Sequence, residues 1–201
     1  MKVVPTRRTQ TERSEATQAA LTATARRLFA ERGYANVGTE EIVRDAGVTR
    51  GALYHHFDGK AGLFRAVFEQ LEAEIAQRMA EEALARPDPW EAMVAGLELF
   101  LDICTEPEVQ RIALLDAPSV LGWETWREIE GRYGLGLVRL GLENLMKAGL
   151  ARRQPVDPLA HALLGTLYEA GLYVARADDV GAAREEMEAV LRGMLEGLRE
   201  S

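Results

Sequence analysis

The sequence predicts an all-α protein, and three observations support this class. Apolar residues recur at helical spacing from residue 15 onward, so that one face of each segment can be buried. No stretch alternates apolar and polar residues for long enough to predict a strand. Glycine, proline and aspartate punctuate the pattern, and they divide the chain into about nine helical segments.

The first predicted helix covers roughly residues 15–32. Gly33 follows it at the position where a helix C-cap is expected. The inward face is a stripe with i, i+4, i+7 and i+8 spacing, formed by Leu21, Ala25, Leu28 and Phe29. About a dozen residues before this helix have no such pattern and are expected to be loose.

Two short helices joined by a glycine turn are predicted next. Thr39 is a candidate N-cap of the first of them, and its first turn carries two glutamates. Thr49 is a candidate N-cap of the second, which runs from Arg50 to Phe57. Leu53 and Phe57 form the inner face of that second helix.

A long helix over residues 60–86 should connect the N-terminal and C-terminal parts of the chain, because it begins after Asp58-Gly59 and ends before Pro87. Asp157 is a candidate N-cap, with Pro158 at the first helical position of its segment. Further helices are predicted over residues 89–104, 107–115, 120–147, 158–177 and 181–200. Boundaries are expected at Pro107, Pro118, Gly149 and Asp178-Asp179, and a break within 120–147 at Gly131, Gly134 and Gly136.

Charge separates the chain into two predicted domains. The net charge is −8 over 201 residues, with 47% hydrophobic residues, which suits a globular protein with an ordinary core. Residues 1–65 contain 11 Lys and Arg against 7 Asp and Glu, a net +4, whereas residues 66–201 contain 13 against 25, a net −12. A basic N-terminal domain with a basic arm and an acidic body fit a DNA-reading unit joined to one that avoids DNA.

The stretch from Thr39 to Phe57 fits a helix-turn-helix, in which the second helix lies in the major groove of DNA. The predicted outer face of this helix consists of Arg50, Gly51, Ala52 and His55. Side chains with donors for phosphate are Thr39, Thr49, Tyr54, His56 and Lys60. Arg50 is the candidate specificity residue, since a bidentate contact to guanine contributes about 1–3 kcal/mol of discrimination. Arg7, Arg8 and Arg13 are either a solvated tail or an arm that reaches the DNA.

The sequence resembles the TetR/AcrR family of bacterial regulators over about its first 65 residues. The matching residues are the run from Ala25 to Tyr34, which contains Leu28-Phe29 and Gly33-Tyr34, then Thr39 to Phe57, then Lys60 and Leu63-Phe64. The resemblance implies a three-helix DNA-binding head on a helical ligand-binding and dimerisation body. It also implies phosphate contacts at Thr39, Tyr54 and Lys60, and base-edge contacts at Arg50, Gly51 and His55.

Dimerisation is expected, because two recognition helices must meet successive major grooves of a palindrome. The last two predicted helices are apolar around much of their circumference and resemble the two dimer helices of the family. The candidate interface residues are Leu163, Leu167, Val190, Met194 and Leu198. For any one of these residues, burial inside a single chain is the alternative.

A pocket for a small-molecule effector is implied by the same resemblance. Its candidate lining residues are Met93, Phe100, Cys104, Trp123, Trp126 and Tyr168, although large side chains at helical spacing are ordinarily core. Cys104, the single cysteine, is interpreted as a small buried hydrophobe rather than a reactive thiol. His161 and Glu169 interrupt an apolar helix, and they could contact an effector, a dimer partner or an arginine.

Other functional classes find little support in the sequence. No catalytic motif or phosphate loop is recognisable, so an enzyme is not expected, and no cofactor or metal is predicted. His55 and His56 are adjacent, so they point about 100° apart on a helix and do not form a metal pair. No apolar signal core or uncharged membrane span is present, which predicts a cytoplasmic protein. The alternative function is a protein-interaction adaptor with a vestigial DNA-binding head.

Overall fold

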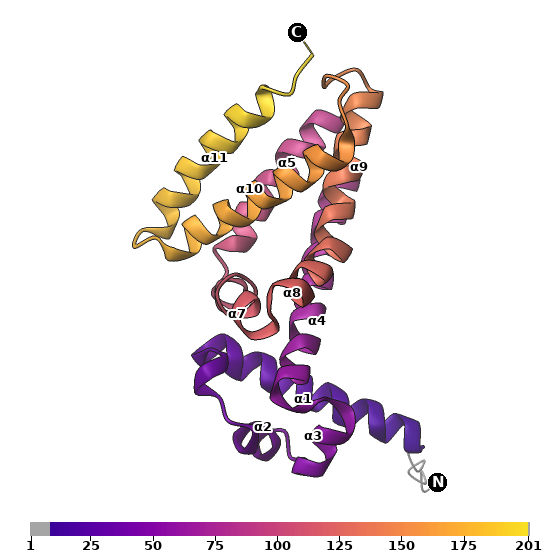
Figure 1. The fold of residues 1–201 in the computed structure, drawn as a ribbon, viewed down its shortest axis with the longest axis vertical. Helices are drawn as coiled ribbons and strands as arrows, with labels where there is room; N and C mark the ends of the chain where they lie inside the picture. The colour runs from indigo at the N-terminus through magenta and orange to yellow at the C-terminus, as the bar shows by residue number, and fades with distance from the viewer. Residues whose placement is uncertain (1–8, 201) are drawn as a thin grey trace, which may run out of the picture. The chain divides into compact units, whose positions relative to one another are not determined.

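A computed structural model describes residues 9–200, and within them the all-α prediction is confirmed (Figure 1). The chain divides into two compact units, one ending at Val67 and the other beginning at Phe68. The boundary falls inside one continuous helix, α4 (Gly59–Leu84). Outside helices, these residues contain an isolated bridge between Ala151 and Arg199.

The N-terminal unit is built from α1 (Gln10–Arg32), α2 (Thr39–Asp45), α3 (Arg50–His56) and the first turns of α4. An aromatic cluster lies in its core. The ring of Phe64 lies 5.3 Å from that of Phe29 and 5.2 Å from that of Tyr34. The fully buried side chains around this cluster include Leu21, Ile42, Leu53, Leu63 and Val67.

Helix α1 begins earlier than the predicted residue 15, because Thr9 and Glu12 form a capping box. The Glu12 amide donates to the Thr9 hydroxyl at 3.2 Å, and the Thr9 amide donates to the Glu12 carboxylate at 2.6 Å. Arg13, predicted to be part of a loose arm, therefore lies in α1. Arg7 and Arg8 lie outside the described residues.

The predicted N-cap is wrong for the first of the two short helices and correct for the second. Thr39 is the first residue of α2 rather than its N-cap, which is Gly38 in an extended conformation without a side-chain cap. Thr49 does cap α3, since its hydroxyl accepts from the Ala52 amide at 3.2 Å. Gly47, with φ of 67°, lies in the turn that follows α2, as the sequence predicts.

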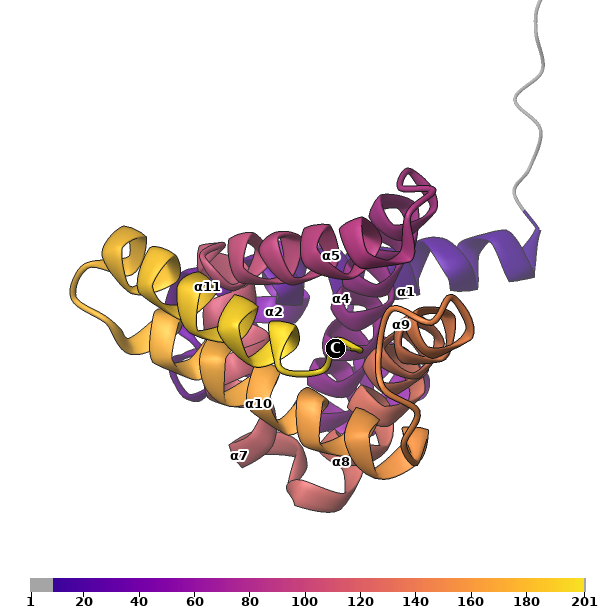
Figure 2. The same cartoon turned by 90° about the horizontal axis from the view of Figure 1, so that it is seen from above.

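The C-terminal unit is organised around α10 (Val156–Arg176), which packs against α5 (Pro89–Cys104), α9 (Gly136–Lys147) and α11 (Val180–Glu196) (Figures 1 and 2). Helix α11 also packs against α5. One core cluster joins these elements through buried Leu101, Ala170, Val174 and Leu191.

The predicted helix boundary at Pro118 is wrong. Short α6 (Pro107–Val109) continues without a break through a π-helical segment, Gln110–Asp116, into α7 (Ala117–Leu121). Proline has no N–H for the carbonyl four residues before it, which here is that of Leu114. The Tyr168 hydroxyl donates to this oxygen at 3.4 Å. The chain remains helical through Pro118.

The predicted break within residues 120–147 takes the form of a second π-helical segment. Helix α8 (Trp123–Glu130) passes through Gly131–Leu135 into α9 in one continuous run. Gly122, with φ of 75°, separates α7 from α8. The glycines therefore widen the helix here instead of ending it.

The ends of α10 and α11 also differ from the prediction. Helix α10 begins at Val156 with Pro155 as N-cap, so Asp157 lies in the first turn, where its carboxylate pairs with Arg139 at 2.8 Å. Helix α11 ends at Glu196 instead of near 200. The Arg152 amide donates to the Leu198 carbonyl at 3.0 Å, and this pairing holds the last residues in an extended course.

Gly171 allows α10 to approach α5 closely. A Cβ atom at this position would lie 2.9 Å from the Cys104 sulfur and 3.3 Å from Leu114. We expect Gly171→Ala to destabilise the protein by about 1–2 kcal/mol, because overpacking outweighs the gain in helix propensity. Gly136→Ala is the matched control, since nothing lies near its Cβ position, and it should be neutral or stabilising. Urea unfolding measures both, and equal responses would contradict this account.

Candidate nucleic-acid interface and ligand pocket

Helix α3 separates its side chains into an inner and an outer face. Leu53 is fully buried, and Phe57, which follows the helix, is 7% exposed. Tyr54 is 52% exposed. On the outer side Arg50, Gly51 and His55 are exposed, while Ala52 and His56 are half-buried. The three residues predicted to contact base edges, Arg50, Gly51 and His55, are therefore all exposed to solvent.

Arg50 is held by two neighbours on the outer surface. Its guanidinium donates to the Glu40 carboxylate at 2.8 Å, and it lies 5.6 Å from the centre of the Tyr54 ring. Both members of the ion pair are exposed, and such pairs contribute only about 0–1 kcal/mol. Arg50 can therefore exchange Glu40 for another acceptor at little cost.

The two threonines predicted as phosphate contacts flank these helices. Thr39 is half-buried in the first turn of α2, and Thr49 is exposed at the N-terminus of α3. The rings of His55 and His56 meet edge to face at 5.1 Å. Within residues 9–200, no group of three or more His, Cys, Asp or Glu side chains could hold a metal ion.

Lys60 has a structural role that the sequence did not indicate. Its ammonium group donates to the carbonyl oxygens of Tyr34 and Val37, both at 2.9 Å, and lies 3.9 Å from the centre of the Tyr34 ring. Burial lowers the pKa of this ammonium group. Lys60 therefore fastens the connection between α1 and α2 to the start of α4, and it retains one N–H for an external acceptor.

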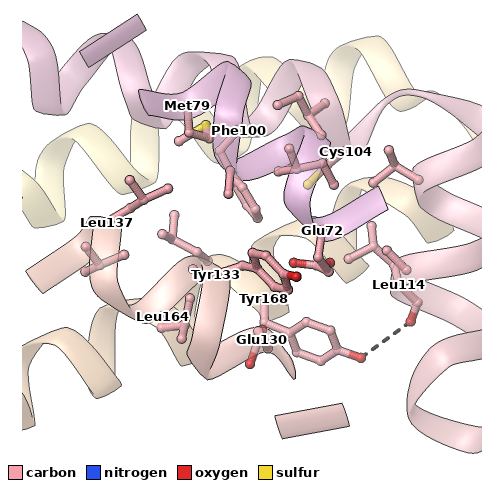
Figure 3. Close-up of a pocket in the computed structure, with 18 of the residues that line it drawn as sticks. Glu72, Met79, Phe100, Cys104, Leu114, Glu130, Tyr133, Leu137, Leu164 and Tyr168 are labelled. Atoms are coloured by element: carbon pink, nitrogen blue, oxygen red, sulfur yellow. Dashed lines mark hydrogen bonds between the residues drawn. The ribbon is translucent and has the colours of Figure 1, made fainter. Parts of the chain in front are cut away.

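A cavity of about 110 Å³ lies in the C-terminal unit between α4, α5, α10 and the two π-helical runs (Figure 3). Its walls are mainly apolar. They include Ile75, Met79, Phe100, Cys104, Leu114, Trp126, Tyr133, Leu137, Leu164, Leu167 and Tyr168. Both π-helical segments contribute, since Ala113 and Leu114 come from one and Tyr133 and Gly134 from the other. π-Helical turns occur frequently at functional sites.

Four of the six predicted pocket residues line this cavity, namely Phe100, Cys104, Trp126 and Tyr168. The other two lie elsewhere. Met93 packs against the core cluster around Trp90 and Leu145, because Gly141 leaves space for its side chain. Trp123 is 67% exposed, and its ring contacts the ring of Trp126, with the ring centres 5.1 Å apart.

Two carboxylates in the wall, Glu72 and Glu130, were not predicted (Figure 3). Glu130 is 9% exposed and pairs with Arg127. Burial raises the pKa of Glu130, although Arg127 opposes this. Burial and the charge of Glu130 raise the pKa of Glu72 to about 7. The sequence did contain a signal, since Glu72 continues the apolar stripe of α4 four residues after Phe68.

Cys104 behaves as a buried apolar side chain. Burial and the charges of Glu72 and Glu106 raise the pKa of its thiol to about 12, so the thiolate form is scarce at neutral pH. The thiolate is the reactive form of cysteine.

The predicted dimer residues divide into two groups. Val190 is 57% and Met194 is 49% exposed on α11, and Leu163 is half-buried on α10. The other two are half-buried: Leu167 lines the cavity, and Leu198 packs against the core cluster of Trp90. Of the two polar residues in α10, His161 lies 3.4 Å from the Arg127 guanidinium, and Glu169 is exposed.

None of the helices in the described part of the chain is long and apolar enough to cross a membrane.

Comparisons with known proteins match both units. The model "Bacterial regulatory proteins, tetR family" matches residues 21–67, and "Tetracyclin repressor-like, C-terminal domain" matches residues 90–198. The regulator CymR of Pseudomonas putida is 34% identical over 161 residues, which cover 77% of this chain and 78% of CymR.

Solved structures share the fold. A TetR-family transcriptional regulator from Pectobacterium atrosepticum has a TM-score of 0.86 and 36% identity, and the match covers 96% of this chain and 99% of that one. The resorcinol complex of RolR has a TM-score of 0.72 at 23% identity, covering 92% and 90% of the two chains. The RolR match shows the shared fold alone.

Lys60→Met should destabilise the protein by about 2 kcal/mol, because two partly buried carbonyl oxygens lose a charged donor. Lys147→Met provides the same chemical change at an exposed position and should have little effect. Chemical unfolding monitored by circular dichroism compares the two variants. A Lys60 variant as stable as the control would show that the two hydrogen bonds contribute nothing.

Proposed function

Because the chain belongs to the TetR family of bacterial DNA-binding transcriptional regulators, we propose that it is a cytoplasmic repressor. In this proposal its homodimer binds a palindromic operator and releases it when a small molecule occupies the cavity of the C-terminal unit. The observation that carries the proposal is the outer face of α3, where Arg50, Tyr54 and His55 are exposed together.

The outer face of α3 supplies the two kinds of contact that operator binding needs. Arg50 is suited to a guanine edge in the major groove, and Gly51 and Ala52 permit close approach. Tyr54, Thr39, Thr49 and His56 have donors for phosphate oxygens. The weak pair between Arg50 and Glu40 lets the guanidinium turn to a base without a large loss of energy.

Homodimer formation is proposed through the exposed apolar surface of α10 and α11. Tyr173, Val190 and Met194 are each about half exposed or more, although α10 and α11 pack together on their other sides. Large apolar side chains gathered on two adjacent helices indicate a surface that another copy covers. A two-fold pair would place two copies of α3 on one operator.

Release by an effector is proposed through the cavity. Helix α4 contributes Glu72, Ile75 and Met79 to the cavity wall, while its first turns belong to the N-terminal unit. A molecule in the cavity can therefore favour one position of α4 over another. To reverse occupancy from 99:1 to 1:99, the effector must prefer the released state by about 5.5 kcal/mol. Resorcinol, the ligand in the RolR complex, is a small molecule of about one ring.

Operator binding is tested by selecting bound sequences from random duplex DNA at moderate salt. A palindrome should be recovered. Tyr54→Ala should weaken binding to all sites, because a phosphate contact carries no sequence information. Arg50→Ala should cost about 1–3 kcal/mol and relax specificity at one position of each half-site. Gel-shift titration gives both dissociation constants.

Arg176→Ala, at the end of α10, is the control for loss of a positive charge away from α3. If no sequence is enriched and neither α3 variant differs from this control, the head does not read DNA. The adaptor function would then be the better account.

Dimer formation is tested by Met194→Glu, which places a charge on the exposed apolar surface. If this surface is buried between two copies, the variant should weaken dimerisation by about 3 kcal/mol or more, because an unpaired charge is buried. Leu140→Glu changes an equally exposed leucine, 55% exposed, on α9 and should leave the dimer intact. Sedimentation velocity distinguishes them. A Met194→Glu protein that stays dimeric would place the interface elsewhere.

A further inference from the structure

Glu72 is a half-buried carboxylate without a partner. It faces the cavity from α4 (Figure 3), and within residues 9–200 it has no hydrogen bond or ion pair to another side chain or to the backbone. An ionised carboxylate is strongly disfavoured in an apolar environment unless something compensates its charge. The residues that line the cavity include no cation that could supply this compensation.

The groups that face Glu72 across the cavity provide no positive charge. They are the Glu130 carboxylate from α8, the Tyr133 and Tyr168 rings from the second π-helical segment and α10, and the Cys104 thiol from α5. The nearby cation, Arg127, is already paired with Glu130, and it does not line the cavity. Glu130 is thus neutralised within the protein, whereas Glu72 is not.

The rest of the wall suits an apolar cation. Trp126, Tyr133, Tyr168 and Phe100 surround the cavity, and aromatic faces attract positive charge. The volume, about 110 Å³, is of the order of a cavity that accepts a single benzene ring, about 150 Å³. A ligand of about one ring with one positive charge therefore matches both the size and the charge of the site.

We propose that the effector of this protein is a small apolar amine, bound in its protonated form, with Glu72 as the counter-ion of its ammonium group. This inference rests on the proposed function, since it names the ligand class of the same cavity. The ammonium group would donate to the Glu72 carboxylate, and the apolar part would contact the aromatic wall. A charged hydrogen bond in a site shielded from water is stronger than a neutral one.

The proposal has a definite pH dependence. Burial and the charge of Glu130 raise the pKa of Glu72 to about 7, so the carboxyl group is mostly protonated at pH 6 and mostly ionised at pH 8. An amine that remains protonated over this range needs the ionised form. Its affinity should therefore fall as the pH is lowered from 8 to 6, approaching about tenfold per unit below pH 7.

Three probes that share one ring test the charge directly: benzylamine, benzyl alcohol and ethylbenzene. Isothermal titration calorimetry on the full chain without DNA measures their dissociation constants at pH 8 and pH 6. Benzylamine should bind at least about tenfold more tightly than the two neutral probes at pH 8, as expected for a charged hydrogen bond. This preference should shrink at pH 6. Equal or tighter binding of ethylbenzene, or no binding of benzylamine, overturns the proposal.

Two variants locate the effect. Glu72→Gln keeps the shape of the side chain and should remove the preference for benzylamine and its pH dependence. Glu81→Gln makes the same change at an exposed carboxylate on α4, which accepts from Gln77 outside the cavity, and should behave as the wild type. A Glu72→Gln protein that retains the full preference overturns the assignment. If this variant does not fold, the pH series on the wild-type chain decides.

Operator release separates this inference from the function on which it rests. If benzylamine binds through Glu72 but the selected operator stays bound, the ligand class is supported and the release mechanism is wrong. If a neutral probe binds without dependence on Glu72 and releases the operator, the release mechanism is supported and the ligand class is wrong.

Discussion

The N-terminal unit depends on one constraint: its two central helices are too short to be stable alone. Helices α2 and α3 contain seven residues each, whereas isolated helices need roughly 12–15 residues even with favourable sequences. Burial of Ile42 and Leu53 therefore holds them in place. Because one face of α3 is committed to this core, its other face is fixed in orientation, and Arg50 and Tyr54 are presented in a defined direction.

The C-terminal unit differs from the N-terminal unit in that its packed helices enclose a cavity. Its two π-helical segments both form part of the cavity wall. Gly171 brings α10 close to Cys104, which seals that side of the packing. The cavity is thus bounded by helices of unusual geometry on two sides and by tight packing on another.

The sequence predicted much of this fold because local signals coincide with structure in most places. Gly33, Gly47 and Thr49 end or cap helices as expected, and the apolar stripe of α1 is buried. The start of α1 could have been read from Thr9 and Glu12. The continuation of the helix through Pro118 could not, because a π-helical segment precedes the proline and the Leu114 carbonyl there contacts Tyr168, 54 positions further along the chain.

The cavity was harder to predict than the fold. Periodicity shows which face of a helix is buried but not whether that face meets another helix or a void, and so it could not separate Met93 from Phe100. A π-helical turn adds a residue and rotates the faces after it by about 100°. The family resemblance gave a pocket and a dimer surface without assigning residues to either.

The contact between Tyr168 and Leu114 connects the contents of the cavity to the geometry of its wall. Pro118 has no N–H to donate to the Leu114 carbonyl four residues before it, and the hydroxyl of Tyr168, a side chain of the cavity wall, donates to this oxygen. A molecule that draws this hydroxyl to itself would remove this hydrogen bond from the carbonyl. The wall of the cavity and the helix around Pro118 therefore share one hydroxyl group.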